Sequence, residues 1–412
     1  MSRAIASVLA VFFVAVWTAT AAAKSPPPGA HAARTACGIV APGHQATAAL
    51  RVRGGQMQDT SGHRFIPYGI SIVGGPETAQ WRTSERSAAA QIAAAAAAWH
   101  VNVLRLQVSE AELLKPSSKG AAYNVQFAQS VDRLVCAILN AHAIPVINDN
   151  TLFTGNSKGP TRTTVEFWRF MARRYGNLPV IFDLFNEPRV TRALPANTVL
   201  SPATIWRVWQ SGGVVNGIRY YGMQDLVHAI RVTEKAHNVI WADTAYKGAE
   251  TRPLPHHLLK GGNIVYAFHK GLTIRGSAWT QQIETLVRKR IPVVNGEWTQ
   301  FAATDRPWMC DPGGYRSVPQ YLALLRRLSI GLVAWSLQPG SLVEGTPGVN
   351  TVHDGAWPDY PTDPRALETP SVMTPTYGCD VASRGQGAGA LVMQQFKQLS
   401  RKPPATLFPV FS

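Results

Sequence analysis

The sequence has 412 residues, a length that suits one large barrel or two smaller domains. Its hydrophobic fraction of 46% is typical of a globular protein with a sizeable core. Its 40 Lys and Arg residues outnumber its 24 Asp and Glu residues, which gives a net charge of +16. The basic residues are scattered, with no basic run or aromatic-interleaved basic motif. This argues against a nucleic-acid-binding protein and leaves a solvated basic surface or adhesion to acidic cell walls.

The N-terminus carries the pattern of a secretory signal. Arg3 precedes an apolar run over residues 4–17, and the small residues at 18–23 suit a cleavage site. An uncleaved membrane anchor is the alternative, but the run is short for a full span and no other stretch is apolar enough. We therefore expect a signal peptide at residues 1–23, a secreted protein (extracellular or periplasmic) and no stable membrane insertion after cleavage. Residues 24–48 are rich in Pro and Ala and predict a linker.

Apolar runs and amphipathic stretches alternate along the rest of the chain. The first is a hairpin between Leu50 and Tyr68, around a turn at Asp59–His63, which we expect to plug the bottom of a barrel. Strands are then predicted at residues 65–73, 101–108, 144–147, 180–185, 238–243, 263–268, 291–296 and 330–335. Helices are predicted at residues 87–99, 127–142, 164–175 (with Thr163 or Thr164 as the N-cap), 223–236 and 391–399.

This order of elements predicts an α/β protein, with a parallel sheet closed into a single (β/α)8 TIM barrel over residues 49–412. In such a barrel the chemistry lies at the carboxyl ends of the strands. From Gln338 to Gly389, after strand eight, the chain is rich in Pro, Gly and Asp and has no sustained period. We therefore expect a long functional loop there.

Two glutamates stand at the ends of buried strands. The run that starts at Val180 leads to Asn186-Glu187-Pro188, and the run that starts at Ile291 leads to Gly296-Glu297-Trp298. A carboxylate at the end of an apolar strand is costly to bury unless the site needs it. Two such carboxylates at one end of a parallel barrel suit the paired-carboxylate chemistry of glycoside hydrolysis.

These two motifs resemble the acid/base and nucleophile motifs of glycoside hydrolase family 5, the cellulase-like (β/α)8 barrels of clan A. The resemblance extends over most of residues 50–400, and the segments that carry it include 102–106, 222–227, 238–241 and 334–336. It implies a retaining glycosidase in which Glu187 is the acid/base and Glu297 is the nucleophile.

The resemblance also implies substrate-binding roles for four further residues. Asn186 corresponds to the residue that bonds the sugar 2-hydroxyl, and Arg105 is similar to the arginine that supports the nucleophile. His269 resembles the strand-six histidine that contacts substrate, and Trp335 resembles the aromatic floor under the sugar. The alternatives are a capping asparagine, a structural ion pair of Arg105, a satisfied polar histidine and a core tryptophan.

Two positions depart from the family pattern. Gly271 stands where the family has a tyrosine bonded to the nucleophile, and Asn150 and Thr151 occupy a region that often holds a histidine. Tyr266 is not expected to replace the missing tyrosine, whereas Tyr360 or Tyr377 of the long loop would be a substitute. These departures bear on the details of the site and on its substrate more than on the reaction.

Four cysteines in a secreted chain favour disulfides over metal ligation, because none has CxxC spacing and no histidine pair accompanies them. Three pairings are possible, and free buried cysteines are an alternative. On the barrel topology, Cys310 and Cys379 both belong to the carboxyl face, which leaves Cys37 to pair with Cys136.

We therefore expect a secreted, monomeric, retaining β-glycosidase that acts on a β-1,4-linked polysaccharide or oligosaccharide, with no metal, cofactor or nucleic-acid partner. Cellulase-like endo-action is the first expectation, followed by a mannanase or an exo-glycosidase. Trp206 and Trp209, and Trp357 and Tyr360 of the long loop, are expected to wall the cleft. The alternative is a non-catalytic secreted barrel that binds carbohydrate or the cell wall. The two glutamates argue against it, and the missing tyrosine favours it.

Overall fold

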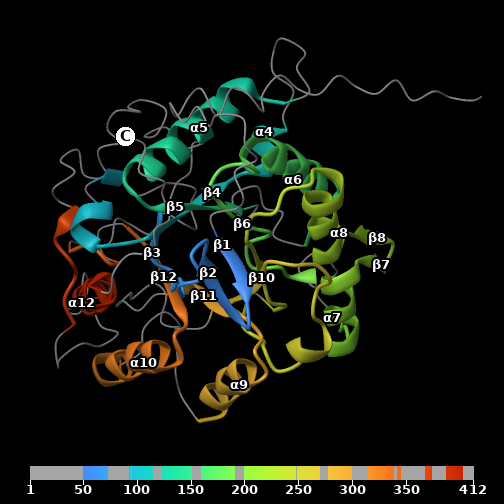
Figure 1. Cartoon of the computed structure of the whole chain (residues 1–412). Helices are drawn as coiled ribbons and strands as arrows, with labels where there is room; N and C mark the ends of the chain where they lie inside the picture. The colour runs from blue at the N-terminus through green and yellow to red at the C-terminus, as the bar shows by residue number, and fades with distance from the viewer. Residues whose placement is uncertain are drawn as a thin grey trace, which may run out of the picture.

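Eight parallel strands close into a barrel in the computed structural model of the chain (Figure 1), which confirms the predicted fold. The structure describes residues 50–72, 92–93, 95–114, 123–150, 159–190, 199–246, 248–269, 277–298, 314–337, 341–344, 367–373 and 387–401. The strands follow one another around the barrel as β3 (Tyr68–Ile72), β4 (Val103–Val108), β5 (Ile144–Asp149), β6 (Ile181–Asp183), β9 (Ile240–Asp243), β10 (Ile264–Phe268), β11 (Val293–Trp298) and β12 (Gly331–Ala334). Because every neighbouring pair is parallel, all their carboxyl ends lie at one end of the barrel.

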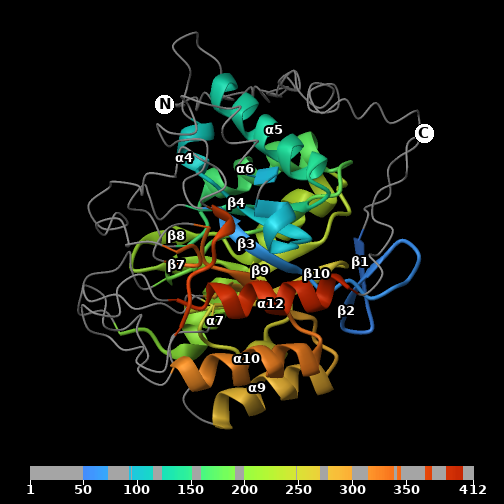
Figure 2. The same cartoon turned by 90° about the vertical axis from the view of Figure 1, so that its left-hand side faces the viewer.

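Helices surround this barrel, because each has an apolar face that needs a partner surface. In Figure 2, α12 lies along the side of the barrel, with α10 and α9 beside it. Every helix within the described ranges is too short or too polar to cross a bilayer. The described helices are α4 (Glu110–Leu113), α5 (Val125–Asn140), α6 (Arg162–Tyr175), α7 (Pro202–Ser211), α8 (Met223–His228), η3 (Ala229–Thr233), η4 (Leu254–His256), α9 (Ser277–Arg288), α10 (Gly314–Leu328) and α12 (Gly389–Ser400), and residues 92–93 and 95–99 are also helical.

The N-terminal hairpin closes the end of the barrel at which the strands begin (Figure 1). It consists of β1 (Leu50–Arg53) and β2 (Gln56–Asp59), which pair antiparallel. Its side chains Leu50 and Met57, together with Phe65, are buried in one cluster with the residues that fill the barrel interior. These contacts confirm the predicted plug.

The turn of this hairpin differs from the prediction. It lies at Gly54 and Gly55, whose φ values of +58° and +82° suit glycine. The segment Asp59–His63, predicted as the turn, forms a second turn in which Asp59 N–H donates to His63 O at 2.9 Å. The prediction missed the first turn because it took the whole segment as one alternating unit.

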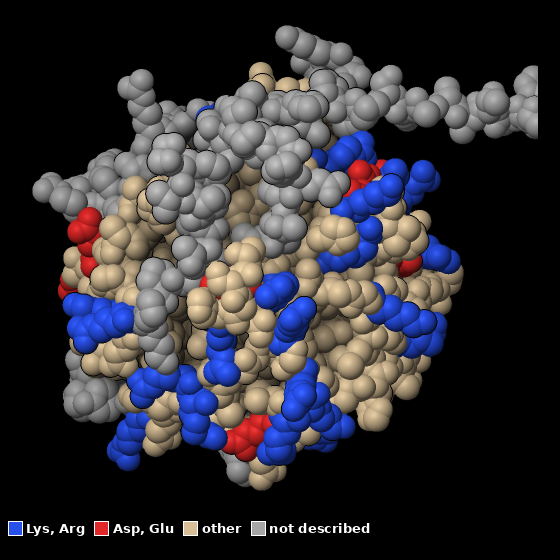
Figure 3. Space-filling view, in the orientation of Figure 1, with Lys and Arg blue, Asp and Glu red and all other residues tan. Residues whose placement is uncertain are grey.

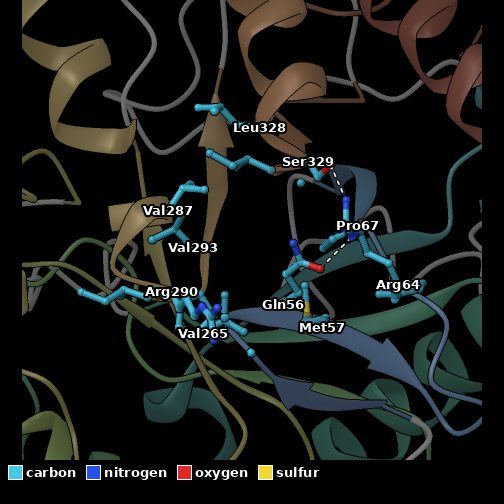
Figure 4. Close-up of a pocket in the computed structure, with 17 residues that line it drawn as sticks. Gln56, Met57, Arg64, Pro67, Val265, Val287, Arg290, Val293, Leu328 and Ser329 are labelled. Atoms are coloured by element: carbon cyan, nitrogen blue, oxygen red, sulfur yellow. Dashed lines mark hydrogen bonds between the residues drawn. The ribbon is translucent and has the colours of Figure 1, made fainter. Parts of the chain in front are cut away.

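A cavity of about 50 Å³ lies between the hairpin and the amino ends of the strands (Figure 4). Arg64 is among its lining residues, and its guanidinium donates to Gln56 Oε1 at 2.7 Å and to Ser329 Oγ at 2.8 Å. Lys and Arg side chains are spread over this face, with few acidic side chains between them (Figure 3). Active sites of such barrels lie at the opposite end, so the cavity is not the candidate site.

The segment after β6 forms α7 and a small sheet of β7 (Gly213–Val215) and β8 (Ile218–Tyr220). Trp206 and Trp209 of α7 are 1% and 2% exposed, and their rings pack 5.1 Å apart. The expectation that these two tryptophans wall a cleft is therefore wrong. Their spacing is equally typical of the buried face of a helix, which is where they lie.

The start of α6 also differs by a few residues from the prediction. Its N-cap is Thr161, whose Oγ1 accepts hydrogen bonds from Thr163 N–H at 3.1 Å and Thr164 N–H at 3.4 Å. In return, Thr164 Oγ1 accepts from Thr161 N–H at 2.9 Å. Thr161 and Thr164 therefore form a capping box, in which Thr161 is the N-cap and the predicted Thr164 is the N3 residue.

Several predictions fall on parts of the chain outside the described residues. These are the signal peptide, the linker, Thr151, Gly271, Trp357, Tyr360, Tyr377, Cys37, Cys310 and Cys379. Cys136, on α5, is 7% exposed and is disulfide-bonded. Its partner lies outside the described residues, so both pairings stay predictions.

A buried charged cluster joins α5 to α6 and gives a stability prediction. Arg174 donates to both carboxylate oxygens of Asp132, with a distance of 2.7 Å to Oδ1, and Tyr175 OH donates to Oδ1 at 2.8 Å. Arg174→Ala would leave Asp132, which is 4% exposed, without its cation. We expect this to lower the free energy of unfolding by about 3–5 kcal/mol. Urea denaturation measures it, with the exposed Arg133→Ala as the control, and equal midpoints for the two variants would contradict the prediction.

Candidate active site

Glu187 follows β6 in an unusual backbone conformation. Its φ is +48°, in the left-handed region that residues other than glycine seldom adopt. The Glu187 N–H donates a hydrogen bond of 2.9 Å to Oδ2 of Asp243, the last residue of β9. The Glu187 side chain is 19% exposed, so its carboxyl is open to solvent while its backbone is fixed to the next strand.

Glu297 lies in β11 at an irregularity of the sheet. Asn295 pairs with Leu332 and Trp298 pairs with Ala334, so the β11 strand has one residue more than β12 between these two pairs. Such a bulge breaks the alternation of side chains and turns one of them to a new direction. Here the side chain of Glu297 is 19% exposed, whereas Trp298 is 1% exposed.

The structure brings the two carboxyl groups together. One oxygen of Glu187, one oxygen of Glu297 and a ring nitrogen of His269 all lie within 4.8 Å of one another. Retaining glycosidases hold their two carboxyls about 5–5.5 Å apart, and inverting ones hold them about 6.5–9.5 Å apart to admit a water. The pair has the spacing at which one carboxyl can attack a carbon while the other protonates its leaving group.

Arg105, on β4, is completely buried and joins three groups of the site. Its guanidinium donates to Glu297 Oε2 at 2.6 Å, to Asp183 Oδ2 at 2.8 Å and to Asn186 Oδ1 at 2.8 Å. Burial works to lower the pKa of Arg105, but the carboxylates of Asp183, Glu297 and Asp243 raise it above its ordinary value. Arg105 is therefore a permanent cation that orients Glu297 and Asn186 together.

His269, which follows β10, lies between three carboxyl groups. Its Nε2 is 3.1 Å from Asp243 Oδ2, and its Nδ1 is 3.5 Å from Glu187 Oε1 and 3.9 Å from Glu297 Oε2. Burial works to lower the pKa of His269, but Asp243, Glu297 and Glu187 raise it well above the ordinary value. These carboxyls therefore favour the positively charged form of the ring beside the two glutamates.

Two buried aspartates of the site were missed by the sequence reasoning. Asp183 ends β6 and Asp243 ends β9, and both are fully buried. Burial and the neighbouring Asp243 raise the pKa of Asp183 to about 7, although Arg105 opposes the rise. The signal was present in the sequence, because each aspartate interrupts an apolar strand, as the glutamates do.

A second buried carboxyl pair lies at the neighbouring strand end. Burial raises the pKa of Asp149, the last residue of β5, well above its ordinary value, and Glu110 of α4 raises it further. Burial likewise raises the pKa of Glu110. Asp149 also reaches the site through its backbone, because Asn186 N–H donates to its carbonyl oxygen at 2.9 Å. The backbone of Asp149 therefore supports the loop that carries Asn186 and Glu187.

The remaining predicted residues lie on or next to the barrel strands. Trp335 follows β12 and is half-buried. Its backbone N–H donates to the backbone carbonyl oxygen of Trp298 at 2.6 Å. Within the described ranges, its ring forms no hydrogen bond with the carboxylate network. Asn150 is 1% exposed at the end of β5. Tyr266 is buried, and its OH accepts from Leu259 N–H at 2.7 Å, so Tyr266 does not replace the missing tyrosine, as predicted.

Glu187, His269 and Glu297 together offer one nitrogen and two oxygen atoms, a donor set that a divalent cation can take. Arg105 already supplies a positive charge to Glu297 at 2.6 Å. We therefore assign proton transfer and charge stabilisation to these residues.

A family model described as Cellulase (glycosyl hydrolase family 5) matches residues 59–341. Among solved structures, a β-mannanase from Streptomyces thermolilacinus with mannohexaose aligns with a TM-score of 0.54 and 17% identity, over 78% of this chain and 91% of that chain. The catalytic domain of an endoglucanase from Thermobifida fusca aligns with a TM-score of 0.53 and 16% identity, over 85% of this chain and 97% of that chain. Comparison with curated proteins gave no match. At these identities the similar structures show the fold alone.

Proposed function

The chain belongs to glycosyl hydrolase family 5 and is a retaining glycosidase, and on that basis we propose that it cleaves O-glycosidic bonds in a β-1,4-linked polysaccharide or oligosaccharide. We propose Glu187 as its acid/base and Glu297 as its nucleophile. The observation that carries this assignment is the separation of the two carboxyls, which lie within 4.8 Å of each other at the carboxyl ends of the strands.

The proposed reaction has two displacements. In the first, Glu187 gives its proton to the glycosidic oxygen, and a carboxylate oxygen of Glu297 forms a bond to the anomeric carbon as the bond to the leaving alcohol breaks. In the second, Glu187 takes a proton from water, the water oxygen bonds to the anomeric carbon, and Glu297 leaves as a carboxylate. Each displacement inverts the anomeric carbon, so the product keeps the configuration of the substrate.

Glu297 must be ionised to attack, and its surroundings act on its charge in both directions. Burial raises the pKa of Glu297, His269 and Arg105 oppose the rise, and Glu187 and Asp243 add to it, so that the pKa stays above its ordinary value of 4.5. The carboxylate form of Glu297 therefore requires a pH above the ordinary pKa of a glutamate. This sets the acid limb of the proposed activity.

Asn186 and Trp335 are proposed to bind the sugar. Asn186 Oδ1 accepts from Arg105, whereas its Nδ2 makes no hydrogen bond within the described residues. This orientation supports donation from Nδ2 to a sugar hydroxyl. The half-buried ring of Trp335, at the same end of the barrel, suits packing against the C–H face of a sugar ring.

The substrate class follows from the named relatives as a proposal. The solved structures that resemble the chain include an endoglucanase and β-mannanases. We propose a β-1,4-linked glucan as the first candidate and a β-1,4-linked mannan as the second. We further propose that the enzyme is a monomer and that it is secreted and acts on polysaccharide outside the cytoplasm, as the signal peptide predicted at residues 1–23 suggests.

Reducing-sugar release from a panel of β-glucans, mannans and xylan tests the proposed function. We expect release from a glucan or a mannan, and we expect none from the Glu297→Gln variant. A protein that binds these polysaccharides but releases no sugar would contradict the proposal. That result would instead favour a non-catalytic barrel that binds carbohydrate.

Arg105→Met is expected to move the acid limb of the pH profile to higher pH. Arg105 lowers the pKa of Glu297, so its loss leaves the nucleophile protonated over a wider acid range. The shift of the limb should be at least about one pH unit. The measurement is kcat/KM against pH, with Arg173→Met as the control, because Arg173 pairs with Glu234 at 2.9 Å on the outer helices. An unchanged acid limb in Arg105→Met would contradict the role of Arg105.

A further inference from the structure

Asp243 contacts both Glu187 and His269 through one carboxylate oxygen. Its Oδ2 accepts the 2.9 Å hydrogen bond from Glu187 N–H and lies 3.1 Å from His269 Nε2. Its other oxygen, Oδ1, makes no hydrogen bond within the described residues. The two contacts therefore depend on a single carboxylate oxygen, in a side chain that is fully buried.

The surroundings of Asp243 hold this oxygen in place. Its backbone carbonyl accepts a 2.8 Å hydrogen bond from Trp209 Nε1 of α7, and Asp243 pairs with Ala267 in the barrel sheet. On the other side of the contact, Gly248 approaches the histidine so closely that a Cβ there would lie 2.7 Å from His269 N. These contacts fix the backbone of Asp243 in the sheet and pack the backbone of His269 against Gly248.

The contact between Asp243 and His269 Nε2 determines which ring nitrogen faces the two glutamates. Nε2 is the ring nitrogen next to the Asp243 carboxylate, so a neutral ring in contact with it carries its proton on Nε2, and Nδ1 faces Glu187 at 3.5 Å and Glu297 at 3.9 Å. A neutral ring would then turn a lone pair toward two carboxyls, whereas a protonated ring turns an N–H toward them. The other charged groups nearby are Asp183 of β6 and Arg105 of β4.

We propose that Asp243 is the positioning residue of the acid/base, because its carboxylate holds both the left-handed backbone of Glu187 and the ring of His269 that faces the two glutamates. The inference rests on the proposed function, since it takes Glu187 as the acid/base. Asp243 itself does not touch the reacting atoms. It acts through the direction of the Glu187 carboxyl and through the charge of His269.

Asp243→Ala tests the positioning. The variant loses both contacts, so Glu187 should protonate leaving groups poorly, and kcat/KM for cellotetraose or mannotetraose should fall about 100-fold. Hydrolysis of a 2,4-dinitrophenyl β-glycoside, whose leaving group needs little protonation, should change far less. A loss of equal size for both substrates, or for neither, would overturn the proposal. Asp225→Asn is the matched control, because Asp225 also accepts a backbone N–H, from Gly222 at 2.8 Å, away from the site.

Asp243→Asn tests the charge and remains informative if the alanine variant does not fold. The amide oxygen can still accept the hydrogen bond from Glu187 N–H, so the leaving-group effect should be smaller, but the negative charge that favours the imidazolium is lost. In 15N-histidine spectra, the His269 ring should lose its second proton at a lower pH than in the wild type, where its pKa is raised well above 6.5. His269→Gln identifies the signal among the 11 histidines. The same titration in both proteins would overturn the proposal.

These outcomes separate this inference from the proposed function. If the wild type hydrolyses neither the oligosaccharide nor the aryl glycoside, the proposed function fails. The histidine titration of the wild type and of Asp243→Asn still measures the contact between Asp243 and His269. If the wild type is active and Asp243→Ala shows no dependence on the leaving group, the inference alone fails.

Discussion

Glu297→Gln is expected to lower the hydrolysis of every substrate by about 10⁴-fold or more while substrate still binds. The amide keeps the shape of the side chain and can accept from Arg105, but it cannot form the bond to the anomeric carbon. The measurement is kcat on the oligosaccharide and on a 2,4-dinitrophenyl glycoside, together with the dissociation constant from calorimetry.

Glu284→Gln serves as the control for this prediction. Glu284 lies on α9 and pairs with Arg327 at 2.8 Å, outside the site, so this variant should keep wild-type activity. If Glu297→Gln retained substantial turnover of the aryl glycoside, Glu297 would not be the nucleophile.

Glu187→Ala is expected to give a loss that depends on the leaving group. General acid catalysis contributes about 10²–10⁴-fold, so hydrolysis of the oligosaccharide should fall by that factor. The aryl glycoside should still form the glycosyl-enzyme, which then accumulates because no base activates water. Azide needs no such base and should restore turnover, with a β-glycosyl azide as the product.

The products of azide rescue decide the division of roles between the two glutamates. If azide gave a β-glycosyl azide with Glu187→Ala and an α-glycosyl azide with the Glu297 variant, the proposal would stand. If instead azide gave a β-glycosyl azide with the Glu297 variant and an α-azide with Glu187→Ala, the two roles would have to be exchanged.

The charges of the site predict that the activity depends on pH. Four buried or half-buried carboxyls, Asp183, Glu187, Asp243 and Glu297, surround the cations of Arg105 and His269. The pKa of Asp183 reaches about 7 because its burial and the charge of Asp243 outweigh the attraction of Arg105. Raising the pH therefore adds negative charge that the two cations cannot fully balance.

The strands and the two glutamates could be predicted from the sequence because their signals are local. An apolar run followed by Asn186-Glu187-Pro188 predicts a buried strand and a carboxylate at its end without reference to other segments. The closed order of the strands then follows from their alternation with helices. The hairpin plug was predictable for the same reason, although its turn was placed at the wrong residues.

The contacts that give the site its chemistry could not be predicted in this way. The hydrogen bond from Glu187 N–H to Asp243 joins residues 56 positions apart, and the bond from Arg105 to Glu297 joins residues 192 positions apart. The bulge that turns Glu297 depends on the register between β11 and β12, which apolar runs do not encode. Trp209 was predicted to wall a cleft but is buried, because tryptophans spaced along a helix give the same sequence pattern whether that face of the helix is exposed or buried.

The stereochemistry of the first product tests the central claim most directly. Proton NMR can follow the anomeric signal of the sugar released from an oligosaccharide before mutarotation equilibrates it. Two carboxyls within 4.8 Å of each other require a glycosyl-enzyme and two inversions, so the β-anomer should form first. If the α-anomer formed first, water would have attacked the sugar directly, and the assignment of Glu297 as the nucleophile would be contradicted.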